Sequence, residues 1–112
     1  MSILVTGSTG TFGSKFVEWL QNNSSKQIWS TGRKPKKIKG YYPCDLTNAS
    51  ETKSLIAKLR PQLIFHMAGD YLNTHDLDYS INSLGAKHLI EALIEEDLNA
   101  RIILIGSAAE YG

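Results

Sequence analysis

The 112-residue sequence has little cysteine, no long apolar stretch and no excess of charge of one sign. Its single cysteine, Cys44, excludes an internal disulfide and a zinc site built from cysteines, and it fits a reducing, cytoplasmic setting. The densest apolar runs, Leu63 to Phe65 and Ile102 to Ile105, fall well short of the roughly 20 residues that a membrane helix needs. No export signal precedes Gly7, so we expect a cytoplasmic protein without a membrane partner.

The charges nearly cancel, with 12 Lys and Arg against 11 Asp and Glu. A net charge of +1 gives no bulk field that would favour nucleic acid or a membrane surface, so a small ligand is the expected partner. With 42% apolar and 21% charged residues, the composition is that of an ordinary globular domain. No repeat or interior linker divides the chain, and residues 1–112 are expected to form one domain.

Short apolar runs separated by helical patterns predict an α/β fold. The runs are nearly continuous, which is typical of parallel strands that are covered on both faces. Right-handed crossovers then give a doubly wound sheet of about five strands in the order 3-2-1-4-5. The expected strands are Ile3 to Thr6, Gln27 to Thr31, Tyr41 to Cys44, Leu63 to Met67 and Arg101 to Ile105.

Three segments show helical spacing. The first follows the glycine cluster and repeats apolar residues from Phe12 to Leu20. The second begins at the capping pair Asn48 and Glu51 and is halted by Pro61. The third is a long helix from Leu77 to Glu96.

Three glycines, Gly7, Gly10 and Gly13, follow the first strand and open the first helix. Gly7 suits a tight turn, Gly10 lets the backbone approach a phosphate, and Gly13 lets the helix pack closely on the strand. Thr11 and Phe12 lie at the helix start, where unpaired N–H groups and the helix dipole favour an anion. The alternative is a turn that uses glycine without a ligand, but the strand–turn–helix context favours a dinucleotide pyrophosphate.

Arg33 stands about 20 residues after the glycines, near the end of the second strand. In this architecture an acidic residue there binds the ribose 2′-hydroxyl of NAD, whereas an arginine accommodates the 2′-phosphate of NADP. No Asp or Glu occurs between Glu18 and Asp45. We therefore predict NADP as the cofactor and keep NAD as the alternative; the lysines up to Lys39 are read as a solvated loop.

The segment Val5-Thr6-Gly7-x-x-Gly10-x-x-Gly13 resembles the signature of the extended short-chain dehydrogenase/reductase family of nucleotide-sugar epimerases, dehydratases and reductases. The resemblance implies a Rossmann-type fold that binds NAD or NADP. It also implies that Asp45 of the Asp45-Leu46 pair contacts the adenine amino group. An acid at a helix start is the alternative reading of Asp45.

Further segments carry the same resemblance. His66-Met67-Ala68-Gly69 is similar to the family's fourth strand end, which runs along the ribose and nicotinamide side of the cofactor; His66 itself is read as a structural histidine. Asn82, in a pattern similar to the family's Asn-x-x-Gly, is implied to organise the active site, with a structural clasp as the alternative.

The last segment of the chain most resembles nucleotide-sugar 4-keto reductases, in the residues Gly106-Ser107-Ala108-Ala109-Glu110-Tyr111-Gly112. It puts Ser107 at the catalytic hydroxyl position, although Ser107 can also be an ordinary loop residue. Dehydratases of the family have Glu where Ala109 stands, which disfavours that activity. The family's Tyr-x-x-x-Lys pair, in which the cation lowers the Tyr pKa, occurs nowhere in these 112 residues.

The resemblance therefore implies the dinucleotide-binding part of a nucleotide-sugar oxidoreductase or epimerase. We expect it to be inactive alone and to meet a nucleotide sugar only in a full-length form. Family resemblance also implies a homodimer through the long helix. The alternative is a non-catalytic dinucleotide-binding or interaction module.

Overall fold

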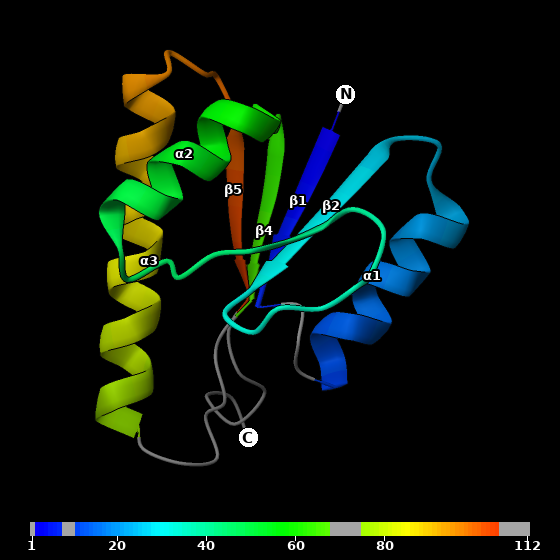
Figure 1. Ribbon diagram of the computed structural model, residues 1–112, viewed down its shortest axis with the longest axis horizontal. Coiled ribbons are helices and arrows are strands. Elements are labelled where there is room, and N and C mark those ends of the chain that lie inside the picture. Colours follow the sequence, from blue (N-terminus) through cyan, green and yellow to red (C-terminus); the bar gives the residue numbers. More distant parts are fainter. Residues whose placement is uncertain (1, 8–10, 68–74, 106–112) are drawn as a thin grey trace.

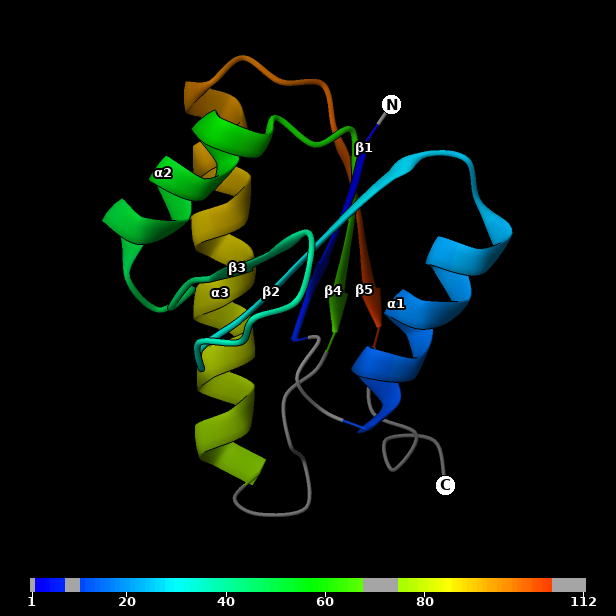
Figure 2. The same cartoon turned by 45° about the vertical axis from the view of Figure 1, so that its right-hand side comes forward.

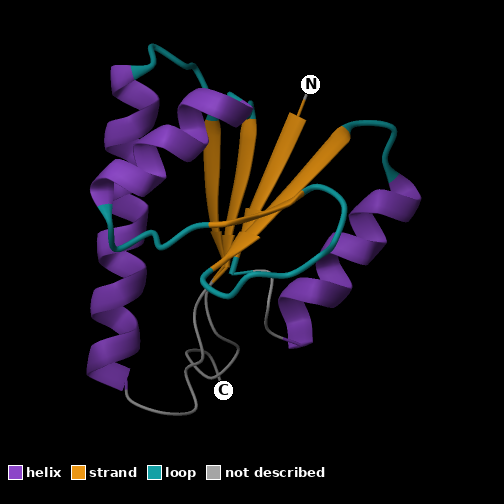
Figure 3. Cartoon of the chain, viewed as in Figure 1, coloured by secondary structure: helices purple, strands orange, loops and turns teal. Residues whose placement is uncertain are grey.

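The computed structural model describes residues 2–7, 11–67 and 75–105, and within them the chain forms one parallel sheet. Its strand order is β3-β2-β1-β4-β5, and every neighbouring pair is parallel, which confirms the predicted doubly wound sheet. Figure 3 shows the strands side by side, with helices to either side of them. The strands are β1 (Ser2–Thr6), β2 (Gln27–Gly32), β3 (Tyr41–Pro43), β4 (Leu63–Met67) and β5 (Arg101–Ile105).

The three helices in the described parts of the chain are divided between the two faces of the sheet. Helix α1 (Thr11–Asn23) covers one face, and α2 (Ala49–Leu59) and α3 (His75–Glu95) cover the other (Figures 1 and 2). This division follows from right-handed crossovers, because the chain moves one way from β1 to β2 and the opposite way from β3 through β4 to β5. The basic segment between β2 and β3 is a loop, as predicted.

Helix α2 shows how the local sequence sets the ends of an element. Asn48 is its N-cap, and the Asn48 side chain accepts a hydrogen bond of 3.1 Å from the Glu51 N–H. The helix ends at Leu59, because Arg60 adopts a left-handed conformation (φ 45°) and its N–H bonds the Ile56 carbonyl. The residue before a proline is disfavoured in the α region, so Pro61 keeps Arg60 out of the helix, and the last helical residue is Leu59.

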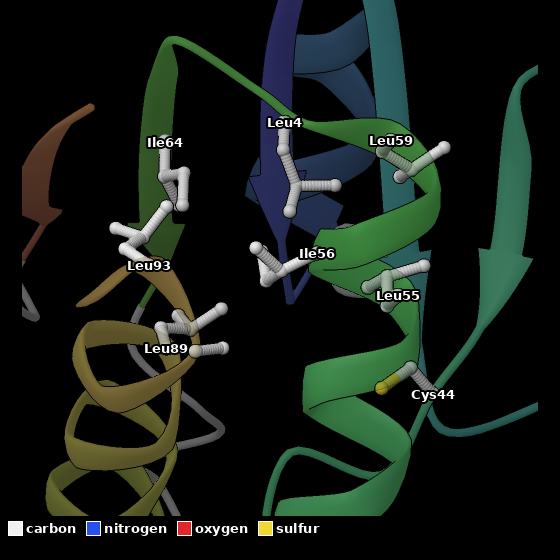
Figure 4. Close-up of a cluster of buried hydrophobic side chains, with 9 residues drawn as sticks. Leu4, Cys44, Leu55, Ile56, Leu59, Ile64, Leu89 and Leu93 are labelled. Atoms are coloured by element: carbon white, nitrogen blue, oxygen red, sulfur yellow. The ribbon is translucent and has the colours of Figure 1, made fainter. Parts of the chain in front are cut away.

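The larger core lies between the sheet and the pair α2 and α3. Leu4 and Ile64, on the central strands, are fully buried and meet Ile56 and Leu89 from the helices (Figure 4). Fully burying such a side chain stabilises the fold by roughly 1.5–3 kcal/mol. This cluster therefore fixes both helices on the sheet. Its buried members are Leu4, Cys44, Leu55, Ile56, Leu59, Ile64, Leu89, Ala92 and Leu93.

A smaller core lies under α1. Phe16 meets Phe65 of β4 edge to face, with ring centroids 5.0 Å apart. On the same face, Ile103 of β5 keeps 39% of its surface exposed. Within the described parts of the chain, no helix is long and apolar enough to cross a membrane. The buried members of this cluster are Ile3, Val5, Val17, Leu20, Ile28 and Met67.

Candidate functional site

The carboxyl ends of β1, β2 and β4 meet at one edge of the sheet, and the first turn of α1 lies toward the same edge (Figures 1 and 3). In open α/β sheets ligands bind outside the carboxyl ends of the strands, where the strand order reverses. Here the reversal falls between β1 and β4, since β1 is followed by β2 on one side and β4 lies on its other side. The candidate site is therefore this edge.

Gly7 follows β1 directly and has the left-handed conformation expected of it, with φ +68°. A Cβ atom on Gly7 would lie 3.1 Å from the Met67 carbonyl oxygen and 3.2 Å from the Met67 Cβ. Glycine is favoured on both counts, because the conformation is unfavourable for other residues and a Cβ atom would be crowded by Met67 at the end of β4. The turn after β1 is thus pressed against the end of β4.

Helix α1 presents its N-terminus at this edge. It begins at Thr11, and its first turn contains no acidic residue, so the helix brings no carboxylate of its own to the positive end of its dipole. Gly13 is buried, as close packing of the helix on the sheet requires. Such a helix start offers unpaired N–H groups to an anion.

Arg33 comes directly after β2, and its side chain is exposed. Both neighbours are anchored: the Gly32 carbonyl accepts a 2.8 Å hydrogen bond from the Cys44 N–H, and the Lys34 carbonyl accepts one from the Tyr41 hydroxyl. The backbone of Arg33 is therefore held at the end of β2 while its guanidinium faces solvent.

Asp45 lies in the turn between β3 and α2. Its Oδ1 accepts hydrogen bonds from the Thr47 hydroxyl (2.6 Å) and the Thr47 N–H (3.0 Å). These two bonds are the main reason that the pKa of Asp45 is lowered; burial opposes them, and the nearby charge of Arg33 makes a smaller lowering contribution. Asp45 and Arg33 are thus close enough to interact, and the carboxylate stays ionised at neutral pH. The N-cap of α2 is Asn48, so Asp45 does not have the capping role.

His66 and Met67 end β4 next to the glycine turn. The His66 ring is buried, and its Nδ1 lies 2.6 Å from the Thr6 Oγ1, which agrees with the structural reading of this histidine. Met67 is buried as well, and its side chain belongs to the core under α1. The atoms of Met67 that lie close to the glycine turn are those of its carbonyl group and its Cβ.

Leu46 has contacts with α3 that the sequence does not reveal. Its carbonyl oxygen lies 2.6 Å from the His88 Nδ1, and its Cβ lies 3.3 Å from where a Cβ on Gly85 would be. Gly85 also faces the His66 ring, at 3.4 Å from the same point. The glycine of the Asn-x-x-Gly pattern thus allows α3 to approach both the Asp45–Thr47 turn and the end of β4.

Several predicted site residues fall outside what the structure describes. Gly10, Ala68, Gly69 and Ser107 lie outside the described residues. The backbone of Thr11, Phe12 and Asn82 is helical, and their side chains are outside the description. In the described parts of the chain, no group of His, Cys, Asp or Glu side chains could hold a metal ion.

A parallel sheet in the order 3-2-1-4-5, with a left-handed glycine between β1 and the helix that follows it, defines a Rossmann-type fold. The chain belongs to the NAD-dependent epimerase/dehydratase family, whose sequence profile it matches over residues 3–112. This membership confirms the resemblance drawn from the glycine turn and the strand-end motifs.

One related protein is GDP-6-deoxy-D-talose 4-dehydrogenase of Aggregatibacter actinomycetemcomitans, 25% identical over an alignment that covers 100% of this chain and 37% of that protein. Among solved structures, L-threonine dehydrogenase from Phytophthora infestans has a TM-score of 0.73 at 24% identity, with 93% of this chain and 35% of that one covered. The UDP-glucose 4-epimerase of Thermus thermophilus, in complex with NAD, has a TM-score of 0.68 at 22% identity, with 88% and 35% covered. The chain spans little more than a third of the length of these proteins.

Proposed function

We propose that this chain binds a dinucleotide at the carboxyl edge of its sheet and prefers NADP to NAD. The observation that carries the proposal is the placement of Gly7: its left-handed turn leads from β1 into the N-terminus of α1 at the reversal of the strand order. This arrangement supports binding of the pyrophosphate by the N–H groups at the helix start. Family membership supports a nicotinamide dinucleotide as the ligand.

The preference for NADP rests on Arg33. Its guanidinium is exposed at the end of β2, where the adenosine ribose lies in this architecture. A planar guanidinium can form two parallel hydrogen bonds with a 2′-phosphate, and lysines at 34, 36, 37 and 39 add positive charge nearby. No acidic residue lies at the end of β2 to accept a hydrogen bond from the 2′-hydroxyl of NAD.

Asp45 is the proposed partner of the adenine amino group. Its Oδ1 is engaged by Thr47, whereas its Oδ2 has no hydrogen-bond partner among the described residues. An ionised carboxylate accepts hydrogen bonds only, which suits an amino group as donor. Arg33 beside it would then face the ribose of the same nucleoside.

For the whole protein we propose a nucleotide-sugar oxidoreductase or epimerase of the extended short-chain dehydrogenase type, working in the cytoplasm. The dinucleotide, when bound, supplies hydride transfer, and Ser107 is the proposed hydroxyl that orients the sugar oxygen. Because these 112 residues contain no Tyr-x-x-x-Lys pair, we propose that the chain alone binds the dinucleotide without turnover.

The test is a titration of the purified chain with NADPH and NADH, following fluorescence and thermal stability together, because a ligand that binds only the folded state raises stability. We expect NADPH to bind more tightly and R33A to reduce that preference by about tenfold or more, the value of a hydrogen bond to a charged group. K26A removes the same charge before β2, far from this edge, and should leave the preference unchanged. NADH binding as tight as NADPH binding would contradict the NADP proposal, and a folded chain that binds neither would contradict dinucleotide binding.

A further inference from the structure

We infer that His88, on α3, is a positioning residue for adenine recognition, which it serves by holding the turn that carries Asp45. The inference rests on the proposed function, since it takes Asp45 as the group that meets the adenine amino group. It adds a residue on another element, 43 positions away along the chain from Asp45, whose hydrogen bond to that turn is with Leu46.

The hydrogen bond between His88 and Leu46 can have only one donor. A carbonyl oxygen only accepts hydrogen bonds, so the His88 Nδ1, 2.6 Å from the Leu46 oxygen, must carry the hydrogen. The ring is half-buried between α3 and the turn. The same carbonyl receives a longer contact, 3.4 Å, from the Thr52 hydroxyl, whose shorter bond of 2.9 Å goes to the Asn48 carbonyl. His88 is therefore the principal donor to the Leu46 carbonyl.

Gly85 brings the same helix close to the same residue, almost one turn before His88. A Cβ at Gly85 would lie 3.3 Å from the Leu46 Cβ and 3.6 Å from its Cδ1, so the helix backbone itself packs on the Leu46 side chain. His88 thus fixes the backbone of Leu46 while Gly85 bounds its side chain. We call these three residues the Leu46 clamp.

The clamp controls the position of the Asp45 carboxylate, because that carboxylate is held by Thr47 and Leu46 lies between the two residues in the chain. Both hydrogen bonds to the Asp45 Oδ1 come from Thr47, so Asp45 and Thr47 form one closed turn with Leu46 at its centre. A shift of Leu46 displaces this turn as a unit and moves the Asp45 Oδ2 with it. Hydrogen bonds weaken steeply with misalignment, so the Asp45–adenine contact depends on the position of Leu46.

The experiment compares NADPH with its hypoxanthine analogue, in which an oxygen replaces the adenine amino group. That oxygen is an acceptor facing a carboxylate, so the wild-type chain should prefer NADPH. We expect H88A to reduce the ratio of the two dissociation constants by about three- to tenfold, the range for loss of one hydrogen bond. Binding of the hypoxanthine analogue should change less than the binding of NADPH, because the analogue lacks the amino group whose contact with Asp45 depends on the position of the turn.

Two further variants keep the test decisive even if H88A folds poorly. H88N puts an amide N–H near the place of the His88 Nδ1 and should retain the wild-type ratio. H88Q places its amide one bond further out, near the other ring nitrogen, and should behave as H88A does. K87A changes an exposed neighbour on α3 and serves as the matched control, with an unchanged ratio.

The outcomes separate the inference from the function on which it rests. Wild-type ratios in both H88A and H88Q, with NADPH still bound, would overturn the role of His88 and leave dinucleotide binding intact. A wild-type chain that binds NADPH and its analogue equally would overturn adenine recognition by Asp45, and with it the inference. A folded wild-type chain that binds neither would contradict the proposed function itself.

Discussion

Thr6 and His66 are joined by a buried hydrogen bond of 2.6 Å between Oγ1 and Nδ1. They are paired residues of the adjacent parallel strands β1 and β4, and each is the last or next-to-last residue of its strand. Gly7 follows Thr6 and lies against Met67, which follows His66. The bond therefore ties together the two strands whose ends form the floor of the candidate site.

The Thr6–His66 bond is tested by a double-mutant cycle. T6V keeps the shape of the side chain and removes the hydroxyl, so we expect the free energy of unfolding to fall by about 1–3 kcal/mol, the range for depriving a buried polar group of its partner. H66L removes the other partner, the His66 ring nitrogen. The losses in free energy of unfolding, measured by urea denaturation, should not add in the double variant, and we expect a coupling energy of about 0.5–3 kcal/mol. Strict additivity would show that the interaction between Thr6 and His66 contributes nothing to stability.

Gly7 and Gly85 should respond differently to alanine. G7A forces a positive φ on a residue with a side chain and puts the Cβ against the Met67 carbonyl, which should reduce stability by about 1–3 kcal/mol. At Gly85 the backbone is helical, so alanine gains up to about 1 kcal/mol of helix propensity, and the crowding is against the Leu46 side chain. G85A should therefore be the milder change in urea denaturation. Equal losses for both would contradict a special role for the Gly7 conformation.

The sequence predicts the fold nearly completely because the signals that specify it are local. Apolar runs bounded by Gly32 and Pro61 give the strands and helix ends, and the handedness of crossovers gives the strand order. Differences are confined to ends of elements. The third strand stops at Pro43, while the Cys44 N–H still bonds β2, and the long helix begins at His75.

The candidate site is predictable only where its residues follow a strand directly. Gly7 and Arg33 do so, and the structure puts both at the carboxyl edge of the sheet. The contact of His88 with Leu46 gives no sequence signal, because it depends on where α3 lies over the turn 42 residues earlier. The capping pair shows the same limit. Asn48 accepts a hydrogen bond from the Glu51 N–H as predicted, but the Glu51 carboxylate accepts one from the Asp45 N–H, at 3.3 Å, and not from the Asn48 N–H.

The Asn48 cap supports a direct prediction. N48A removes the oxygen that accepts from the Glu51 N–H, and loss of such a cap costs about 0.5–2 kcal/mol. N48S retains a capping oxygen and should lie close to the wild type. S50A, an exposed position in the first turn of the same helix, is the control and should change stability by less than about 0.5 kcal/mol. A cap that did not contribute would leave N48A and S50A indistinguishable in urea.

Cys44 makes the stability of the fold depend on pH in the alkaline range. Its thiol is buried in the larger core, and burial, together with the charges of Glu51 and Asp45, raises its pKa to about 11. In the unfolded chain a thiol ionises near pH 8.5. Between these values the unfolded state releases a proton that the folded state keeps, so rising pH favours unfolding. The contribution is fully present below the unfolded pKa and is lost as pH rises through the folded pKa.

The comparison that isolates this effect is wild type against C44A, with the free energy of unfolding measured in urea at several values between pH 7.5 and 10. C44A is expected to be less stable at neutral pH, because it leaves a cavity in the core. The wild type should then lose stability faster than C44A, by up to about 1.4 kcal/mol for each pH unit above the unfolded pKa, so the gap between them narrows. Tyrosine and lysine titrations are common to both chains and cancel in the difference. A gap that stays constant across this range would mean that the Cys44 thiol ionises as easily in the fold as in the unfolded chain.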